Sequence, residues 1–145
     1  MAIEQAIANS FKKQLLEADH NFASAGGDTF KIALYTSSAT LNSATTVYAN
    51  TNEVSNTGQY VTGGGVLVNA GTSITAGVAR CSFNDRSFTG VTLTARGALM
   101  YNTSSATPNS AVAVLDFGAD KTATSGTFTI QFPNFTSSAA ILRIA

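Results

Sequence analysis

The sequence predicts a mainly β protein: an antiparallel β-sandwich or jelly-roll-like domain of about seven to nine short strands with one N-terminal amphipathic α-helix. Three observations predict this fold class. Apolar and polar residues alternate with a period of two in several segments after residue 28, turn-forming clusters separate these segments at roughly even spacing, and only the first residues show a helical period. The chain has 145 residues without an internal repeat or linker, so a single domain over 1–145 is expected.

The segment 2–18 carries the helical pattern. Ile3, Ile7 and Phe11 follow one another at steps of one helical turn, and most of the charged residues fall on other faces. An amphipathic helix is therefore predicted, which covers one face or end of the sheet or contacts a partner subunit. If the helix contacts a partner, these three apolar residues are the predicted partner-binding residues.

Residues 29–145 are expected to form the β-domain. Strict alternation over 30–35 predicts a strand with one buried face, and a second strand is predicted over 78–83. The intervening residues 69–77 are rich in turn-forming residues and are interpreted as a turn. A final strand is predicted over 139–145.

Two central strands are predicted over 91–101 and 111–117, where apolar residues are densest. A polar loop over 102–110 joins them, and Gly97 marks a possible β-bulge in the first strand. The polar residues 121–126 are interpreted as a further turn.

The composition excludes several classes of protein. Eight basic and eight acidic residues give a formal net charge of zero, whereas nucleic-acid-binding proteins carry a basic patch or excess, so no nucleic-acid partner is expected. No apolar run approaches the roughly 20 residues of a membrane span, so no membrane partner is expected. The single cysteine, Cys81, excludes an internal disulfide and is interpreted as a buried thiol.

No recognisable catalytic or metal-binding pattern occurs in the chain. The single histidine, His20, has no second imidazole or nearby cysteine to complete a zinc site, and is interpreted as a surface or helix-end residue. The run 116–118 spells a kinase metal-binding motif without the other kinase motifs, and the glycines 63–65 lack the Lys-Ser/Thr pair of a phosphate loop. We therefore predict no catalytic residue, no cofactor and no metal, and we do not expect an enzyme.

Four segments together resemble a known group of proteins. They are FKIALYTSSATL (30–41), YANTNEVSNTGQYVTGGGVL (48–67), TARGALMYN (94–102) and AVAVLDFGADK (111–121). As a set they resemble small structural proteins of tailed bacteriophages. The resemblance implies a virion component that is assembled in the host cytoplasm, and it implies no catalytic residues.

Within that group, the length and the compact β-domain with a helical N-terminus resemble capsid decoration, or cement, proteins. The resemblance implies a β-sandwich or jelly-roll unit that binds the major capsid protein or other virion proteins, stabilises the mature head shell, and forms a dimer or trimer. Two alternatives stay open. One is a neck, tail or fibre-associated structural protein, and the other is a carbohydrate-binding module that adheres to host-surface glycans.

Overall fold

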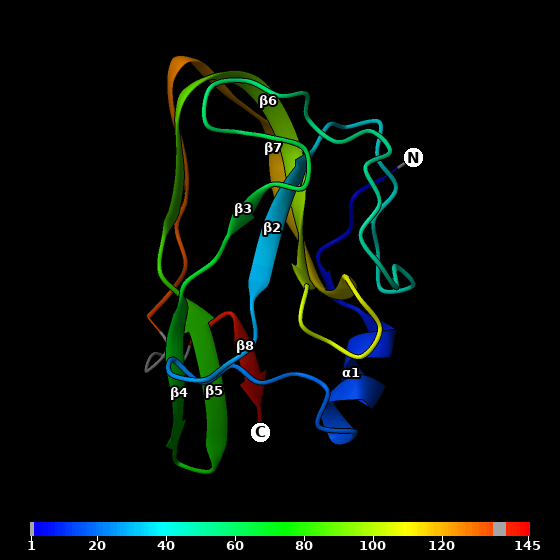
Figure 1. The fold of residues 1–145 in the computed structure, drawn as a ribbon, viewed down its shortest axis with the longest axis vertical. Coiled ribbons are helices and arrows are strands. Elements are labelled where there is room, and N and C mark those ends of the chain that lie inside the picture. Colours follow the sequence, from blue (N-terminus) through cyan, green and yellow to red (C-terminus); the bar gives the residue numbers. More distant parts are fainter. Residues whose placement is uncertain (1, 135–138) are drawn as a thin grey trace.

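Two antiparallel sheets and one short helix make up the computed structural model, which describes residues 2–134 and 139–145 (Figure 1). The larger sheet has the strand order β1-β7-β6-β2-β3, and the smaller has the order β4-β5-β8. The predicted mainly β class with antiparallel sheets is confirmed, and the arrangement is consistent with a β-sandwich. The elements are β1 (Ala6–Ile7), α1 (Asn9–Leu16), β2 (Phe30–Tyr35), β3 (Gly65–Val66), β4 (Asn69–Thr75), β5 (Val78–Phe83), β6 (Arg86–Asn102), β7 (Ser110–Ile130) and β8 (Leu142–Ile144).

A long hairpin of β6 and β7 forms the backbone of the larger sheet. The two strands have 17 and 21 residues and stay paired from Asn102 and Ser110 beside the loop to Arg86 and Ile130 at the far end. The prediction of a turn over 121–126 was therefore wrong, because these residues lie inside β7. Threonines make this segment polar, yet their β-branched side chains suit exposed strand positions.

The predicted bulge at Gly97 is confirmed by a register shift in the hairpin. Ala95 pairs with Lys121 and Gly97 pairs with Asp116, so four residues of β7, 117–120, lie outside the ladder. A Cβ atom at Gly97 would lie 2.5 Å from the carbonyl oxygen of Leu115. Only glycine fits this close approach of the backbone.

The smaller sheet contains a strand that the sequence prediction missed. Residues 69–77 were expected to form a turn, but β4 occupies Asn69–Thr75 and pairs with the predicted strand β5. The turn itself is confined to Ala76 and Gly77, both with positive φ. β4 is an edge strand with mostly exposed or half-exposed side chains, so it lacks the apolar alternation that identifies a half-buried strand.

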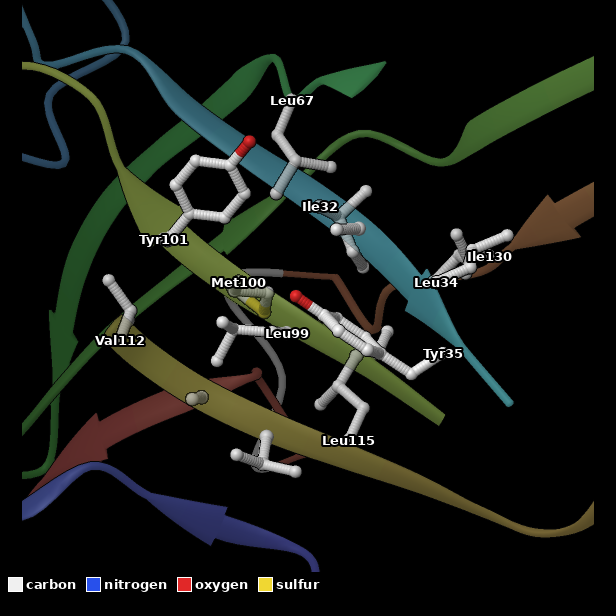
Figure 2. Close-up of a cluster of buried hydrophobic side chains, with 14 of the residues drawn as sticks. Ile32, Leu34, Tyr35, Leu67, Leu99, Met100, Tyr101, Val112, Leu115 and Ile130 are labelled. Carbon is white, nitrogen blue, oxygen red and sulfur yellow. The ribbon is translucent and has the colours of Figure 1, made fainter. Parts of the chain in front are cut away.

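The core lies on both faces of the larger sheet. The prediction of β2 was correct in position, but nearly all of its side chains are buried, and Lys31 alone is half-exposed. Figure 2 shows side chains of β2 beside those of β6 and β7, including Ile32, Leu99 and Val112. Burial on both faces follows because other segments cover each side of this central strand.

The N-terminal helix is much shorter than the predicted segment 2–18. Helix α1 begins at Asn9 and ends at Leu16, while β1 pairs Ala6 and Ile7 with Val114 and Ala113 of β7. The first residues are extended because the outer edge of β7 offers unpaired backbone groups to them. Tertiary pairing overrides a local helical pattern in such a case.

Candidate functional site

The three predicted partner-binding residues do not share one environment. Ile3 and Phe11 are 7% and 4% exposed and belong to the protein's own core, whereas Ile7 is 36% exposed. Helix α1 also packs against β7 of its own chain. The structure therefore leaves only Ile7 of the three at the surface.

Ile7 lies at the edge of an apolar groove between α1 and the smaller sheet. The groove has a volume of about 870 Å³. Its helical side is formed by Phe11, Leu15 and Leu16 of α1, next to Ile7 of β1. Figure 1 shows β8 lying between β5 and α1, so β8 is the strand of the smaller sheet that lies nearest to the helix across the groove.

The strand register places two rows of side chains on the groove side of the smaller sheet. Residues that are directly opposite in a ladder, or two apart in a strand, share one face. The inner row contains Cys81, which is buried, and the outer row contains Ile74 and Ile144, which are 74% and 58% exposed. The inner row is Thr72, Cys81 and Leu142, and the outer row is Ile74, Ala79 and Ile144.

Large aliphatic side chains around the groove are therefore exposed to solvent. Leu16 at the end of α1 is 92% exposed, and Ile74 and Ile144 face it from the sheet side. Complete burial of one such side chain is worth roughly 1.5–3 kcal/mol. A contiguous apolar surface of this kind is typical of an interaction site.

The charged residues that line the groove are all basic. They are Lys12 on α1, Arg80 on β5 and Arg143 on β8, and none of the Asp and Glu residues that the structure describes lines it. Arg80 and Arg143 are opposite each other in the β5–β8 ladder. The groove therefore carries positive charge in a chain whose formal net charge is zero.

A buried polar network lies behind the groove, around His20. The prediction of a surface histidine was wrong, because His20 is 7% exposed and its ring contacts Phe11 with 4.7 Å between centroids. The Asn102 amide donates to His20 Nδ1 at 2.9 Å, and so Nε2 carries the proton and donates to Gln14 Oε1 at 3.0 Å. Burial lowers the pKa of His20, which keeps the ring neutral.

A second polar network surrounds Glu53, which forms an isolated β-bridge with Tyr35 at the end of β2. Its carboxylate accepts hydrogen bonds from Tyr48 at 2.6 Å, Tyr60 at 2.7 Å and the Gly63 N–H at 2.7 Å. The Tyr101 hydroxyl donates to the Gly63 carbonyl at 2.5 Å. Burial, followed by the Glu53 charge, raises the pKa of Tyr101 to about 12.

Both networks connect irregular segments to the sheets. His20 and Glu53, the titratable groups at their centres, are held by hydrogen bonds. Both ring nitrogens of His20 have amide partners, and both carboxylate oxygens of Glu53 accept hydrogen bonds.

Across residues 2–134 and 139–145, no cluster of three or more His, Cys, Asp or Glu could hold a metal ion. No helix in this part of the chain is long and apolar enough to cross a membrane. The groove is the candidate functional site.

Sequence reasoning found only part of this site. Ile7 was predicted, but Leu16, Ile74 and Ile144 were not. Ile74 lay in a segment that was interpreted as a turn, and its isolated apolar side chain among polar residues was the available signal. Comparisons of the chain with protein-family models, curated proteins and solved structures found no match.

Proposed function

We propose that this protein is a structural component of a bacteriophage virion, a capsid decoration protein that binds the major capsid protein and stabilises the mature head shell. The observation that carries the proposal is the groove, with Leu16, Ile74 and Ile144 exposed around it. A compact β unit with such a surface can bind to a preformed lattice by shape and apolar contact. The resemblance of the sequence to structural proteins of tailed phages supports a capsid shell as that lattice.

The stabilising effect follows from mass action. A protein that binds the mature shell, and not its dissociated subunits, adds its binding free energy to the stability of the shell. The groove offers apolar area for this contact, and α1 and the β-sheets hold that area in place. We propose that the anchor is formed by Ile7 together with the three exposed aliphatic residues, and that the protein acts as a dimer or trimer on the shell.

Co-sedimentation with phage heads that lack this protein tests the proposal. We expect saturable binding at a copy number close to the number of shell lattice sites, and a shell that withstands higher temperature when the protein is bound. Binding at a dozen or fewer sites would contradict the decoration role and favour the neck, tail or fibre alternative. Binding to host glycans without binding to heads would favour the carbohydrate-binding alternative.

A pair of matched substitutions shows whether the groove makes the contact. Ile144 and Val68 are both 58% exposed, but only Ile144 lines the groove. We expect Ile144→Ser to weaken head binding and Val68→Ser to leave it unchanged. Equal effects of the two substitutions would contradict the groove as the contact surface.

A further inference from the structure

We propose that the groove binds an extended segment of a partner protein in which acidic residues alternate with apolar ones, and that this segment adds as a strand to the free edge of β8. The inference rests on the proposed function only for the identity of the partner, which would be the capsid subunit. The chemistry of the segment follows from the charge, the open strand edge and the shape of the groove.

The charge of the groove selects an acidic partner. Lys12, Arg80 and Arg143 line the groove and no acidic side chain does. Opposite charges across an interface favour association, and like charges disfavour it. In a two-fold symmetric dimer formed through this surface, each copy would present the same three cations to the other, because such an interface uses one patch twice. The charge therefore disfavours a second copy of this chain in the groove.

The strand edge gives the partner segment its conformation. β8 pairs with β5 on one side, through Ala79–Ile144, Arg80–Arg143 and Cys81–Leu142. No other strand in the described part of the chain pairs with the second side of β8, which lies toward α1 in Figure 1. An open edge presents unpaired N–H and C=O groups, which an extended peptide can satisfy by adding a strand.

The side chains that line the groove along β8 match a partner segment in which acidic and apolar residues alternate. Successive side chains of a strand point to opposite faces. Along β8, Arg143 lies between Leu142 and Ile144, and all three residues line the groove. A strand added beside β8 would place its apolar residues against Ile144 and Leu16, and its carboxylates near Arg143.

Peptide binding measures this specificity directly. The probes are three short fluorescein-labelled peptides: one alternates Val and Glu, one alternates Val and Lys, and one alternates Ser and Glu. We expect the full chain to raise the fluorescence anisotropy of the Val–Glu peptide, and to bind the other two at least roughly tenfold more weakly. Added salt should weaken the Val–Glu complex because the charged groups are near the surface. Equal binding of the Val–Lys peptide would overturn the inference.

Charge reversal locates the binding site. We expect Lys12→Glu combined with Arg143→Glu to reduce the affinity for the Val–Glu peptide by roughly tenfold or more. The matched control is Lys121→Glu, a reversal at an exposed lysine of β7 that does not line the groove. Hydrogen exchange should slow at the amides of 142–144 when the peptide binds. An unchanged affinity in the double variant, or unchanged exchange in β8, would overturn the inference.

Head binding separates this inference from the proposed function. If the protein binds heads and the Lys12/Arg143 double variant binds them equally well, the acidic-segment inference fails and the decoration role stands. If the protein binds the Val–Glu peptide at β8 but does not bind heads, the groove chemistry stands and the decoration role fails.

Discussion

At His20, two amide groups fix the protonation state of a buried ring. Gln14 from α1 and Asn102 from β6 occupy the two ring nitrogens, so the neutral ring connects the helix to the central hairpin. A protonated ring would carry N–H groups at both nitrogens, and Nδ1 would then face the Asn102 amide without an acceptor. Because Asn102 also donates to Asp28 at 2.8 Å, a rearrangement would disturb a third segment.

We expect the free energy of unfolding to fall in mild acid because of His20. Its pKa is lowered in the folded state, so below the unfolded pKa of about 6.5 the unfolded chain binds more protons than the folded chain. Stability should be fully present above about pH 6.5 and should decrease as the pH falls toward the lower folded pKa. Urea unfolding between these limits, on the wild type and on His20→Gln, measures the effect. An identical pH slope in both proteins would contradict it.

The tyrosines predict that the free energy of unfolding also falls at high pH. Burial raises the pKa values of Tyr35, Tyr48, Tyr60 and Tyr101, the last to about 12, whereas an unfolded tyrosine titrates near about 10. Above about pH 10 the unfolded chain loses protons that the folded chain retains, so stability should decrease as the pH rises. Ultraviolet titration of the phenols should show them ionising together with unfolding. Ionisation of all four near pH 10 in the folded protein would contradict this.

At the scale of elements, local periodicity identified some segments and misidentified others. The segments predicted as β2 and β5 are strands because alternation and β-branched or aromatic residues agree there. The N-terminal pattern was ambiguous, since Ile3, Ile7 and Phe11 suit a helix face and also an extended segment followed by a helix. Pairing with the free edge of β7 makes the first residues extended and not helical. No local sequence pattern predicts that pairing.

Substitutions at two positions of α1 separate the observed packing from simple helical periodicity. Phe11 is 4% exposed and Leu16 is 92% exposed. We expect Phe11→Ala to lower the free energy of unfolding by about 3–5 kcal/mol, because it leaves a cavity in the core. Leu16→Ala should change stability by less than about 0.5 kcal/mol, as surface substitutions do. Denaturant unfolding measures both. A small effect at Phe11 would contradict the packing of α1 on the core.

Gly64 holds the loop before β3 against β2. Its φ is +77°, and a Cβ atom there would lie 1.8 Å from the carbonyl oxygen of Ile32. Gly26 has a similar φ of +74° but no atom within 4 Å of such a Cβ. We expect Gly26→Ala to cost about 1–2 kcal/mol for the left-handed backbone alone, and Gly64→Ala to cost clearly more. Equal costs in thermal or urea unfolding would contradict the close contact.

For the molecule as a whole, the fold class was predictable and the site was not. Alternation and turn spacing are local signals, and they gave the mainly β class with antiparallel sheets. The groove is assembled from α1, the hairpin of β4 and β5, and β8, three parts of the chain that lie far apart in the sequence. Its sheet side depends on the register of three strands, one of which was interpreted as a turn, so no pattern in one segment could reveal it.

The most direct test of the proposed decoration role is a cryo-electron microscopy reconstruction of phage virions that contain this protein. We expect density for the β-domain to repeat over the head shell, with the groove between α1 and β8 turned toward the capsid subunit. Density confined to one vertex or to the tail would contradict the decoration role. Density on the shell with the groove facing solvent would keep that role and contradict the groove as its contact surface.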